Sequence, residues 1–210
     1  MTVRTTLYLV RHGETDWNAT DRCQGALDIP MNDNGLRQAR LAGEALRHVE
    51  FHAAYTSSLG RAQQTAAAVL ERSTLIATPI ADLAEMSYGA WHGLRPDEWP
   101  DATAVRWRRD PWSVAFPDGE SLAALRDRVI PAFERIVSTH TGRHVLIASH
   151  GHVNRVMMIH ALASDPNGFW DIEQANGAVF ELALTLVDGK ITRASARQLF
   201  PKPTARDAAQ

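Results

Sequence analysis

Arg11, His12 and Gly13 stand directly after a short apolar run, Leu7–Val10, near the start of the chain. The run has the composition of a buried strand. An arginine and a histidine at the end of a core strand must find polar partners, because burying their polar groups unpaired costs free energy. In an open α/β sheet this end of a strand is where ligands bind. The glycine would let the backbone turn tightly and approach a ligand.

Two later apolar runs end in the same way. The run over 51–56 stops at Ser57–Ser58, and Arg61 follows in the first turn of a predicted helix. The run over 143–148 stops at Ser149–His150. Because the carboxyl ends of parallel strands meet at one edge of a sheet, we expect two arginines and two histidines to gather there.

This set of residue types is suited to phosphoryl transfer. The guanidinium groups of Arg11 and Arg61 match phosphate oxygens and stay charged, and Arg61 shares its position with a helix N-terminus. A neutral His12 could attack phosphorus and form a phosphohistidine, while His150 would donate to a phosphoryl oxygen. Glu85, just past the third predicted strand, is the candidate proton donor, with a pKa raised by a bound dianionic phosphate.

Longer motifs surround these residues. They read RHGETxWN over 11–18, SSLxRA over 57–62, LxExxYGxWxG over 83–93 and SHG over 149–151. In this, the chain resembles the histidine phosphatase superfamily, whose fold is phosphoglycerate mutase-like, and the resemblance runs in order over residues 5–182. One small departure is Met31–Asn32, which replaces the usual Leu-Thr or Leu-Ser before a helix that asparagine caps equally well.

The resemblance implies a role for each site residue. His12 would be the phosphorylated nucleophile and Glu85 the proton donor. Arg11, Arg61 and His150 would form the phosphate pocket. Further contacts to substrate or phosphate are implied for Asn18, Gln24, Ser58 and Gly151.

Rival chemistries fail at named positions. A cysteine phosphatase would need an arginine where Ile29 stands, so Cys23 is expected to be inert, and a serine-hydrolase elbow would need a glycine at Ile147. A metal pair of His150 and His152 would lack a carboxylate partner, so we interpret His152 as a loop histidine. His92 could line the pocket or face solvent, and the tryptophans of 91–112 are expected to pack rather than stack on a ligand.

Within this family the sequence favours a metal-independent phosphatase acting on a small phosphorylated metabolite. Phosphoglycerate mutases of the family carry a longer insertion between the acid and the second histidine and an extended tail, whereas both are short here. A mutase remains the alternative, and a phosphate-binding module with little turnover is a weaker one. No metal or cofactor is expected, because two arginines and two histidines would supply the positive charge.

Composition sets the broader class. The 210 residues are 45% hydrophobic and 22% charged, with a formal net charge of −2, which does not indicate a nucleic-acid or membrane partner. Cys23 is the only cysteine, so an internal disulfide and a zinc–thiolate cluster are excluded. The apolar run near the N-terminus is too short for a signal peptide, so a cytoplasmic location is expected.

The elements that must position the site alternate between strand and helix. This order predicts an α/β fold of three layers, α/β/α, with a mostly parallel central sheet, helices on both faces and an antiparallel edge hairpin. We expect a single domain over 1–200 with a lid-like insertion at about 86–118, and a loose tail at 201–210. The predicted strands cover 7–10, 51–56, 75–80, 143–148, 178–187 and 191–196, and the predicted helices cover 33–46, 60–70, 121–139 and 151–163.

Three local features refine this picture. Residues 13–31 are polar and rich in turn residues, which indicates an ordered loop. Pro131 removes a backbone hydrogen bond and is expected to kink or break the helix over 121–139. Asp188–Gly189 predicts a tight hairpin whose edge strand could pair across a homodimer.

Overall fold

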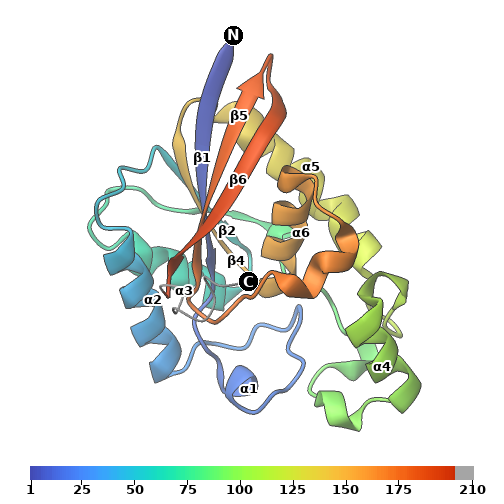
Figure 1. Cartoon of the computed structure of the whole chain (residues 1–210). Helices are drawn as coiled ribbons and strands as arrows, with labels where there is room; N and C mark the ends of the chain where they lie inside the picture. Colours follow the sequence, from blue (N-terminus) through green and yellow to red (C-terminus); the bar gives the residue numbers. More distant parts are fainter. Residues whose placement is uncertain (202–210) are drawn as a thin grey trace.

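The computed structural model describes residues 1–201 of the chain, with the side chain of Asp101 left out. A six-stranded sheet runs in the order β3-β2-β4-β1-β5-β6 (Figure 1). The strands are β1 (Thr2–Arg11), β2 (Ala53–Ser57), β3 (Thr78–Ile80), β4 (His144–Ser149), β5 (Val179–Val187) and β6 (Lys190–Phe200). The first four are parallel to one another, β5 pairs antiparallel with β1, and β6 pairs antiparallel with β5. The predicted α/β sheet with an antiparallel edge hairpin is therefore confirmed. The predicted tail, apart from Pro201, lies outside the described residues.

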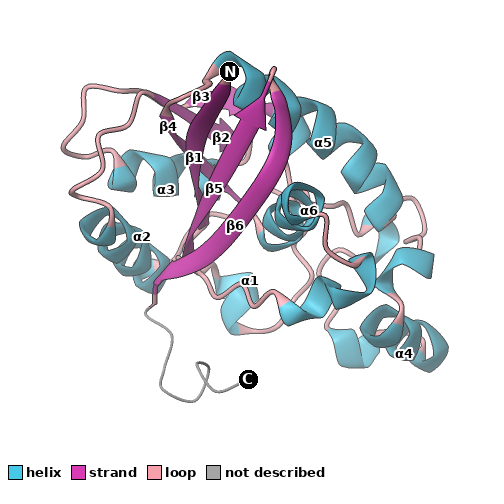
Figure 2. Cartoon of the chain, turned by 45° about the horizontal axis from the view of Figure 1, so that its top comes forward, coloured by secondary structure: helices cyan, strands magenta, loops and turns pink. Residues whose placement is uncertain are grey.

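Helices cover both faces of the sheet (Figure 2). On one face, Tyr8 and Val10 of β1 pack with residues of α2 (Asp33–Ala45) and with Leu70, directly after α3 (Gly60–Val69). On the other face, Leu7 and Leu9 belong to a larger cluster built with α5 (Leu122–Thr139) and α6 (Gly151–Leu162). Alternate side chains of β1 thus enter two separate cores, as the two-residue repeat of a strand requires.

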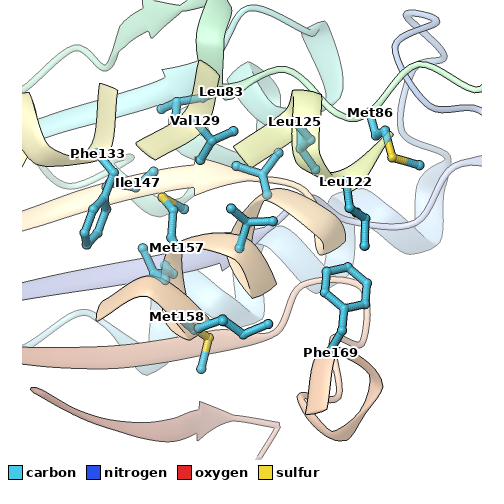
Figure 3. Close-up of a cluster of buried hydrophobic side chains, with 14 of the residues drawn as sticks. Leu83, Met86, Leu122, Leu125, Val129, Phe133, Ile147, Met157, Met158 and Phe169 are labelled. Carbon is cyan, nitrogen blue, oxygen red and sulfur yellow. The ribbon is translucent and has the colours of Figure 1, made fainter. Parts of the chain in front are cut away.

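The larger core anchors the segment that carries Glu85. Leu83 and Met86, on either side of Glu85, are fully buried. Figure 3 shows Leu83 beside Val129 of α5, and Met86 near Leu122 and Leu125 of the same helix. Burying two large side chains so close together leaves the intervening backbone little freedom to move.

The loop after β1 is more structured than the sequence indicated. It contains the short helix α1 (Asp16–Ala19), whose N-cap, Thr15, forms a reciprocal capping box with Asn18. Farther along, Asn32 caps α2 by accepting a hydrogen bond from the amide of Gly35 at 2.9 Å, as expected. Only glycine fits at position 13, because a Cβ there would collide with the backbone carbonyl of Gly35.

Two expectations about regular elements need correction. Helix α5 continues through Pro131, so the expected break is wrong, while the expected kink stays a prediction. Pro131 lies on the exposed side of α5, while Val129 and Phe133 are fully buried, so packing of the inner face holds the helix together across the missing hydrogen bond. The third strand covers only Thr78–Ile80, because the residues before it form no ladder with β2.

Residues 86–118 form mostly short turns around one helix, α4 (Asp101–Arg109), and stand clear of the sheet (Figure 1). Trp99 and Trp107 of this segment are buried against one another and against Phe116, with ring centroids 5.1–6.4 Å apart. Trp107 also contacts His152 and Trp170, so it packs the segment onto the rest of the domain. No helix among the described residues is long and apolar enough to cross a membrane.

Candidate active site

The sheet order brings three strand ends together. β4 lies between β1 and β2, and the register places Arg11 opposite Ser149. The residues that follow these strands meet there, and the rings of His12 and His150 lie 5.1 Å apart between centroids. A cavity of about 220 Å³ opens at this edge, and its walls include Arg11, His12 and Glu85. The predicted gathering of arginines and histidines is therefore present.

His12 is 2% exposed and is held in one tautomer. Its Nδ1 lies 2.7 Å from the carbonyl oxygen of Gly13, and because a carbonyl can only accept, Nδ1 carries the proton. Burial, followed by the charges of His150, Arg61 and Arg11, lowers the pKa of His12 well below its ordinary value. The ring is therefore neutral at neutral pH, with its lone pair on Nε2.

Arg61 is fully buried, and its guanidinium is oriented by main-chain oxygens. Its two Nη atoms donate to the carbonyls of Leu27 and Gly25, both at 2.6 Å. Burial lowers the pKa of Arg61 to about 10, so the group stays charged at neutral pH. Arg11 is oriented in the same manner, with Nη1 donating to the carbonyl of Gln174.

Four donor or acceptor nitrogens in the site have no hydrogen-bond partner. They are Nε of Arg11, Nε of Arg61, Nδ1 of His150 and Nδ1 of His152, each buried. Among the described residues no carboxylate forms an ion pair with either arginine. Buried polar groups are normally satisfied, so unpaired nitrogens beside two uncompensated cations indicate a place for an oxyanion.

His150 is the N-cap residue of α6 and is fully buried. Its Nε2 lies 2.8 Å from the hydroxyl of Ser57, at the end of β2. Burial, with Arg61 next in size, lowers its pKa well below the ordinary value. The contact with Ser57 orients the ring and leaves Nδ1 for a ligand.

Glu85 is ionised in the ligand-free site. Its Oε1 accepts from the amide of Met86 at 2.9 Å, and its Oε2 accepts from the amide of His152 at 3.2 Å. Burial alone raises the pKa of Glu85, but His152, His150 and the Met86 amide together bring it well below the ordinary value. We expected a raised pKa for Glu85 in a site that holds a phosphate dianion. In the ligand-free site the pKa of Glu85 is lowered instead.

The four residues assigned as contacts by resemblance occupy different places. Asn18 and Gln24 line the cavity, and the amide of Gln24 is engaged by Asn18 and Thr15. Gly151 opens α6, where a Cβ would lie 3.7 Å from Nε of Arg11. Ser58 is exposed and lies outside the cavity wall. Their roles in binding stay predictions.

His152 is a site residue that sequence reasoning missed. We interpreted it as a loop histidine, but its ring lines the cavity and its Nδ1 lies 3.3 Å from Oε2 of Glu85. The only available signal was its position two residues after His150, in the first turn of a helix that starts at the site. That spacing by itself could not reveal its partner, which lies far away in the sequence.

Arg155 was also missed. Its Nε donates to the carbonyl of Ile172 at 2.9 Å, and its guanidinium lies over the rings of Phe169 and Trp170, 5.4 and 5.2 Å from their centroids. Burial lowers the pKa of Arg155 to about 10. Because Arg155 stands four residues after Gly151 on α6, it lies on the same helix face, and helical spacing could have indicated it.

The structure also places two other side chains considered in the sequence analysis, His92 and Cys23. Nε2 of His92 accepts from the amide of Tyr88 at 3.2 Å, so His92 supports the backbone rather than facing solvent freely. Burial raises the pKa of the Cys23 thiol to about 11, in keeping with an inert side chain. Within residues 1–201, no group of three or more His, Cys, Asp or Glu side chains could hold a metal ion.

Comparison with known proteins points to one family. A family model described as the histidine phosphatase superfamily (branch 1) matches residues 7–195. The chain is 36% identical over 164 residues to the uncharacterized phosphatase PhoE of Bacillus subtilis, covering 78% of each chain. It is 38% identical over 164 residues to a 2,3-bisphosphoglycerate-dependent phosphoglycerate mutase of Methylobacterium radiotolerans, covering 73% of this chain and 77% of the mutase. The solved structure of mycobacterial glucosyl-3-phosphoglycerate phosphatase aligns with a TM-score of 0.80 at 26% identity, covering 94% of this chain and 97% of that one.

Proposed function

The chain belongs to the histidine phosphatase superfamily, and from this we propose that it is a metal-independent phosphomonoesterase that acts through a phosphohistidine. The observation that carries the proposal is the state of His12. Its Nδ1 is bound to a backbone carbonyl, its ring is neutral, and unpaired nitrogens of Arg11, Arg61 and His150 lie around it. A nucleophile with a free lone pair inside a cationic pocket is what attack on a phosphate dianion requires.

The first half-reaction transfers the phosphoryl group to the enzyme. Nε2 of His12 attacks phosphorus, and the phosphoryl oxygens accept hydrogen bonds from Arg11, Arg61 and His150. The bond between phosphorus and the bridging oxygen breaks. Glu85, protonated once the dianion is bound, gives its proton to that oxygen, and the alcohol leaves.

The second half-reaction releases phosphate. Water attacks the phosphohistidine, and the Glu85 carboxylate takes one proton from that water. The bond between phosphorus and Nε2 of His12 breaks, which returns the neutral ring and the protonated acid. The positive charges of the two arginines stay in place throughout, so they would supply the charge stabilisation for which other phosphatases use a metal ion.

Two features support hydrolysis of a small substrate over mutase chemistry. The cavity of about 220 Å³ lies below the usual range for ligand sites, which suits a small phosphate monoester better than a bisphosphate held at both ends. Asp21 and Arg22 at the cavity wall are exposed, so the cavity that His12 lines is open to solvent in the ligand-free protein. A mutase must keep water from that intermediate. The identity to a phosphoglycerate mutase keeps mutase chemistry as the second candidate.

Release of inorganic phosphate tests the proposal. The panel contains simple alkyl phosphates, p-nitrophenyl phosphate, sugar phosphates, phosphoserine, α-ribazole phosphate and 3-phosphoglycerate, all assayed in EDTA. We expect release from at least one member, loss of all release in His12→Ala, and unchanged release in His160→Gln. His160 is a suitable control because it lies on α6 but pairs with Glu134 at the surface.

Other outcomes would overturn it. Phosphate release by His12→Ala would exclude His12 as the nucleophile. If the wild-type protein released no phosphate but interconverted 3- and 2-phosphoglycerate when primed with 2,3-bisphosphoglycerate, it would be a mutase. Binding of phosphate esters without either activity would identify a binding module.

A further inference from the structure

Glu85 and His152 form a buried pair that the proposed reaction has not yet used. Oε2 of Glu85 and Nδ1 of His152 lie 3.3 Å apart, and the two side chains are 9% and 12% exposed. An ionised carboxylate and an unprotonated ring nitrogen both present lone pairs, which repel at this distance. A proton held between these two atoms would relieve that repulsion.

The ring of His152 is held in place by aromatic neighbours. It stacks on Phe169 at an interplanar angle of 8° and a centroid distance of 5.7 Å. Trp107 and Trp170 lie against it, with centroids 5.7 and 5.9 Å away. The backbone amide of His152 also donates to Oε2 of Glu85. These contacts, which do not depend on the ring's charge, hold the ring nitrogen beside the carboxylate at a distance of 3.3 Å, although the ligand-free alignment falls short of a hydrogen bond.

Cations dominate the surroundings of the pair. Those that act on it or on its immediate neighbours come from β1, α3, α5 and α6: Arg11, Arg61, Arg128 and Arg155. His150 faces the pair as a neutral ring. The groups of negative or potential negative charge are Asp28, Tyr88, Glu120 and Glu173. The segments 101–109 and 166–171 contribute the aromatic rings of Trp107, Phe169 and Trp170. A phosphate dianion entering this field would offset the cations and favour proton uptake by the pair.

We propose that His152 is a positioning residue that shares with Glu85 the proton delivered to the leaving oxygen. The proposal rests on the proposed phosphatase function. In the ligand-free site the shared proton lies on His152, giving an imidazolium beside a carboxylate. When substrate binds, the proton moves from Nδ1 to Oε2, which leaves a neutral ring and a neutral carboxylic acid. Glu85 then protonates the bridging oxygen, and water returns the proton to the pair during the second half-reaction.

Sharing has a consequence for the pH dependence of the reaction. When one proton can be held by either of two groups, the pair stays protonated to a higher pH than the carboxylic acid would alone. The reason is that the proton on Glu85 and the proton on His152 are both protonated forms of the pair. The second place is lost when the imidazole of His152 is removed. The basic limb of the pH profile should then move to lower pH for substrates whose leaving group needs a proton.

The experiment compares two substrates and three variants. The best alkyl phosphate of the panel needs an acid to leave, whereas p-nitrophenyl phosphate has a leaving group stable as an anion. His152→Asn removes the imidazole, and His152→Phe also removes it but keeps an aromatic ring to stack on Phe169. His160→Gln is the control, because it breaks a His–Glu pair at 3.1 Å on the same helix outside the site. The pH profile of kcat/KM is measured for each, with thermal unfolding to confirm that the variants are folded.

We expect both His152 variants to lose about tenfold or more in kcat/KM for the alkyl phosphate at pH 8, with the basic limb shifted to lower pH. The profile for p-nitrophenyl phosphate should keep its shape, and His160→Gln should match the wild type with both substrates. An unshifted basic limb in the His152 variants, or equal losses with both substrates, would overturn the inference. Recovery in His152→Phe alone would show that only packing matters, which would overturn it too. If the wild type released no phosphate from either substrate, the proposed function would fail instead.

Discussion

Individual side chains in this site are held by main-chain groups rather than by opposite charges. Arg61 is bound by the carbonyls of two loop residues, and Nδ1 of His12 by the carbonyl of Gly13. A carbonyl orients a cation without cancelling its charge, whereas a carboxylate would neutralise it. The positive potential at His12 is therefore preserved for an incoming anion.

Glu85→Gln tests the acid at the residue scale. Glutamine is similar in shape, but it cannot transfer a proton to the leaving oxygen. We expect kcat/KM for alkyl phosphates to fall by about 10²–10⁴, with a smaller loss for p-nitrophenyl phosphate. Because the same group would activate water, the phosphohistidine should accumulate in this variant, and an acid-labile, protein-bound phosphate would be measured after quenching. Equal losses with both substrates and no accumulation would remove Glu85 from the assigned role.

Among the elements, α5 holds the segment that carries Glu85. Arg128 on α5 donates to the carbonyls of Asp82, Ala84 and Glu85 at 2.9, 2.8 and 3.2 Å. Its Nε and Nη2 also bind both carboxylate oxygens of Glu120, at 2.7 and 2.8 Å. One guanidinium thus joins the helix to three carbonyls within the segment 82–85, and a lysine could not reproduce its planar fork.

Arg128→Lys is the prediction that belongs to this scale. The pair with Glu120 is about three-quarters shielded from solvent, so we expect a loss of roughly 1–3 kcal/mol in the free energy of unfolding. We also expect a lower kcat with alkyl phosphates, because the backbone of Glu85 loses its anchor. Urea unfolding and steady-state kinetics measure the two effects. Arg126→Lys, which alters an exposed pair with Asp127 on the same helix, should change neither.

Over the whole molecule, burying a set of titratable groups should make folding sensitive to acid. The folded-state pKa values of His12, His150 and Glu85 are all lowered well below their ordinary values. In acid the unfolded chain therefore binds protons that the folded protein cannot take up. The resulting loss begins below the ordinary pKa of histidine, about 6.5, and continues as the pH falls further and carboxylates join.

We therefore expect the free energy of unfolding to fall as the pH is lowered from 7.5 to 5.5. Each fully buried histidine contributes up to about 1.4 kcal/mol per pH unit below 6.5. Urea denaturation across this range measures the slope. The double variant His12→Asn, His150→Asn should show a shallower slope, while the exposed His160→Gln should not. Equal slopes in the wild type and the double variant would contradict this assignment.

Several features could be predicted from the sequence because they depend on neighbours along the chain. Leu7–Val10 alternates between two cores as a buried strand does, and Asn32 caps the helix that follows it. The stops at Arg11–His12 and Ser149–His150 indicated a common sheet edge, since parallel strands that are hydrogen-bonded end together. The motif around His12 also predicted the family, which the family model confirmed.

Other features were decided only by the tertiary structure. The pairing of Glu85 with His152, the three carbonyls held by Arg128 and the survival of α5 through Pro131 all depend on groups that are distant in sequence. The same holds for the sign of the pKa shift of Glu85, where burial opposes the nearby cations and hydrogen bonds. Local patterns set which residues can begin or end an element. Charge balance in a buried site is a sum over every neighbour in space, so it exists only once the chain is folded.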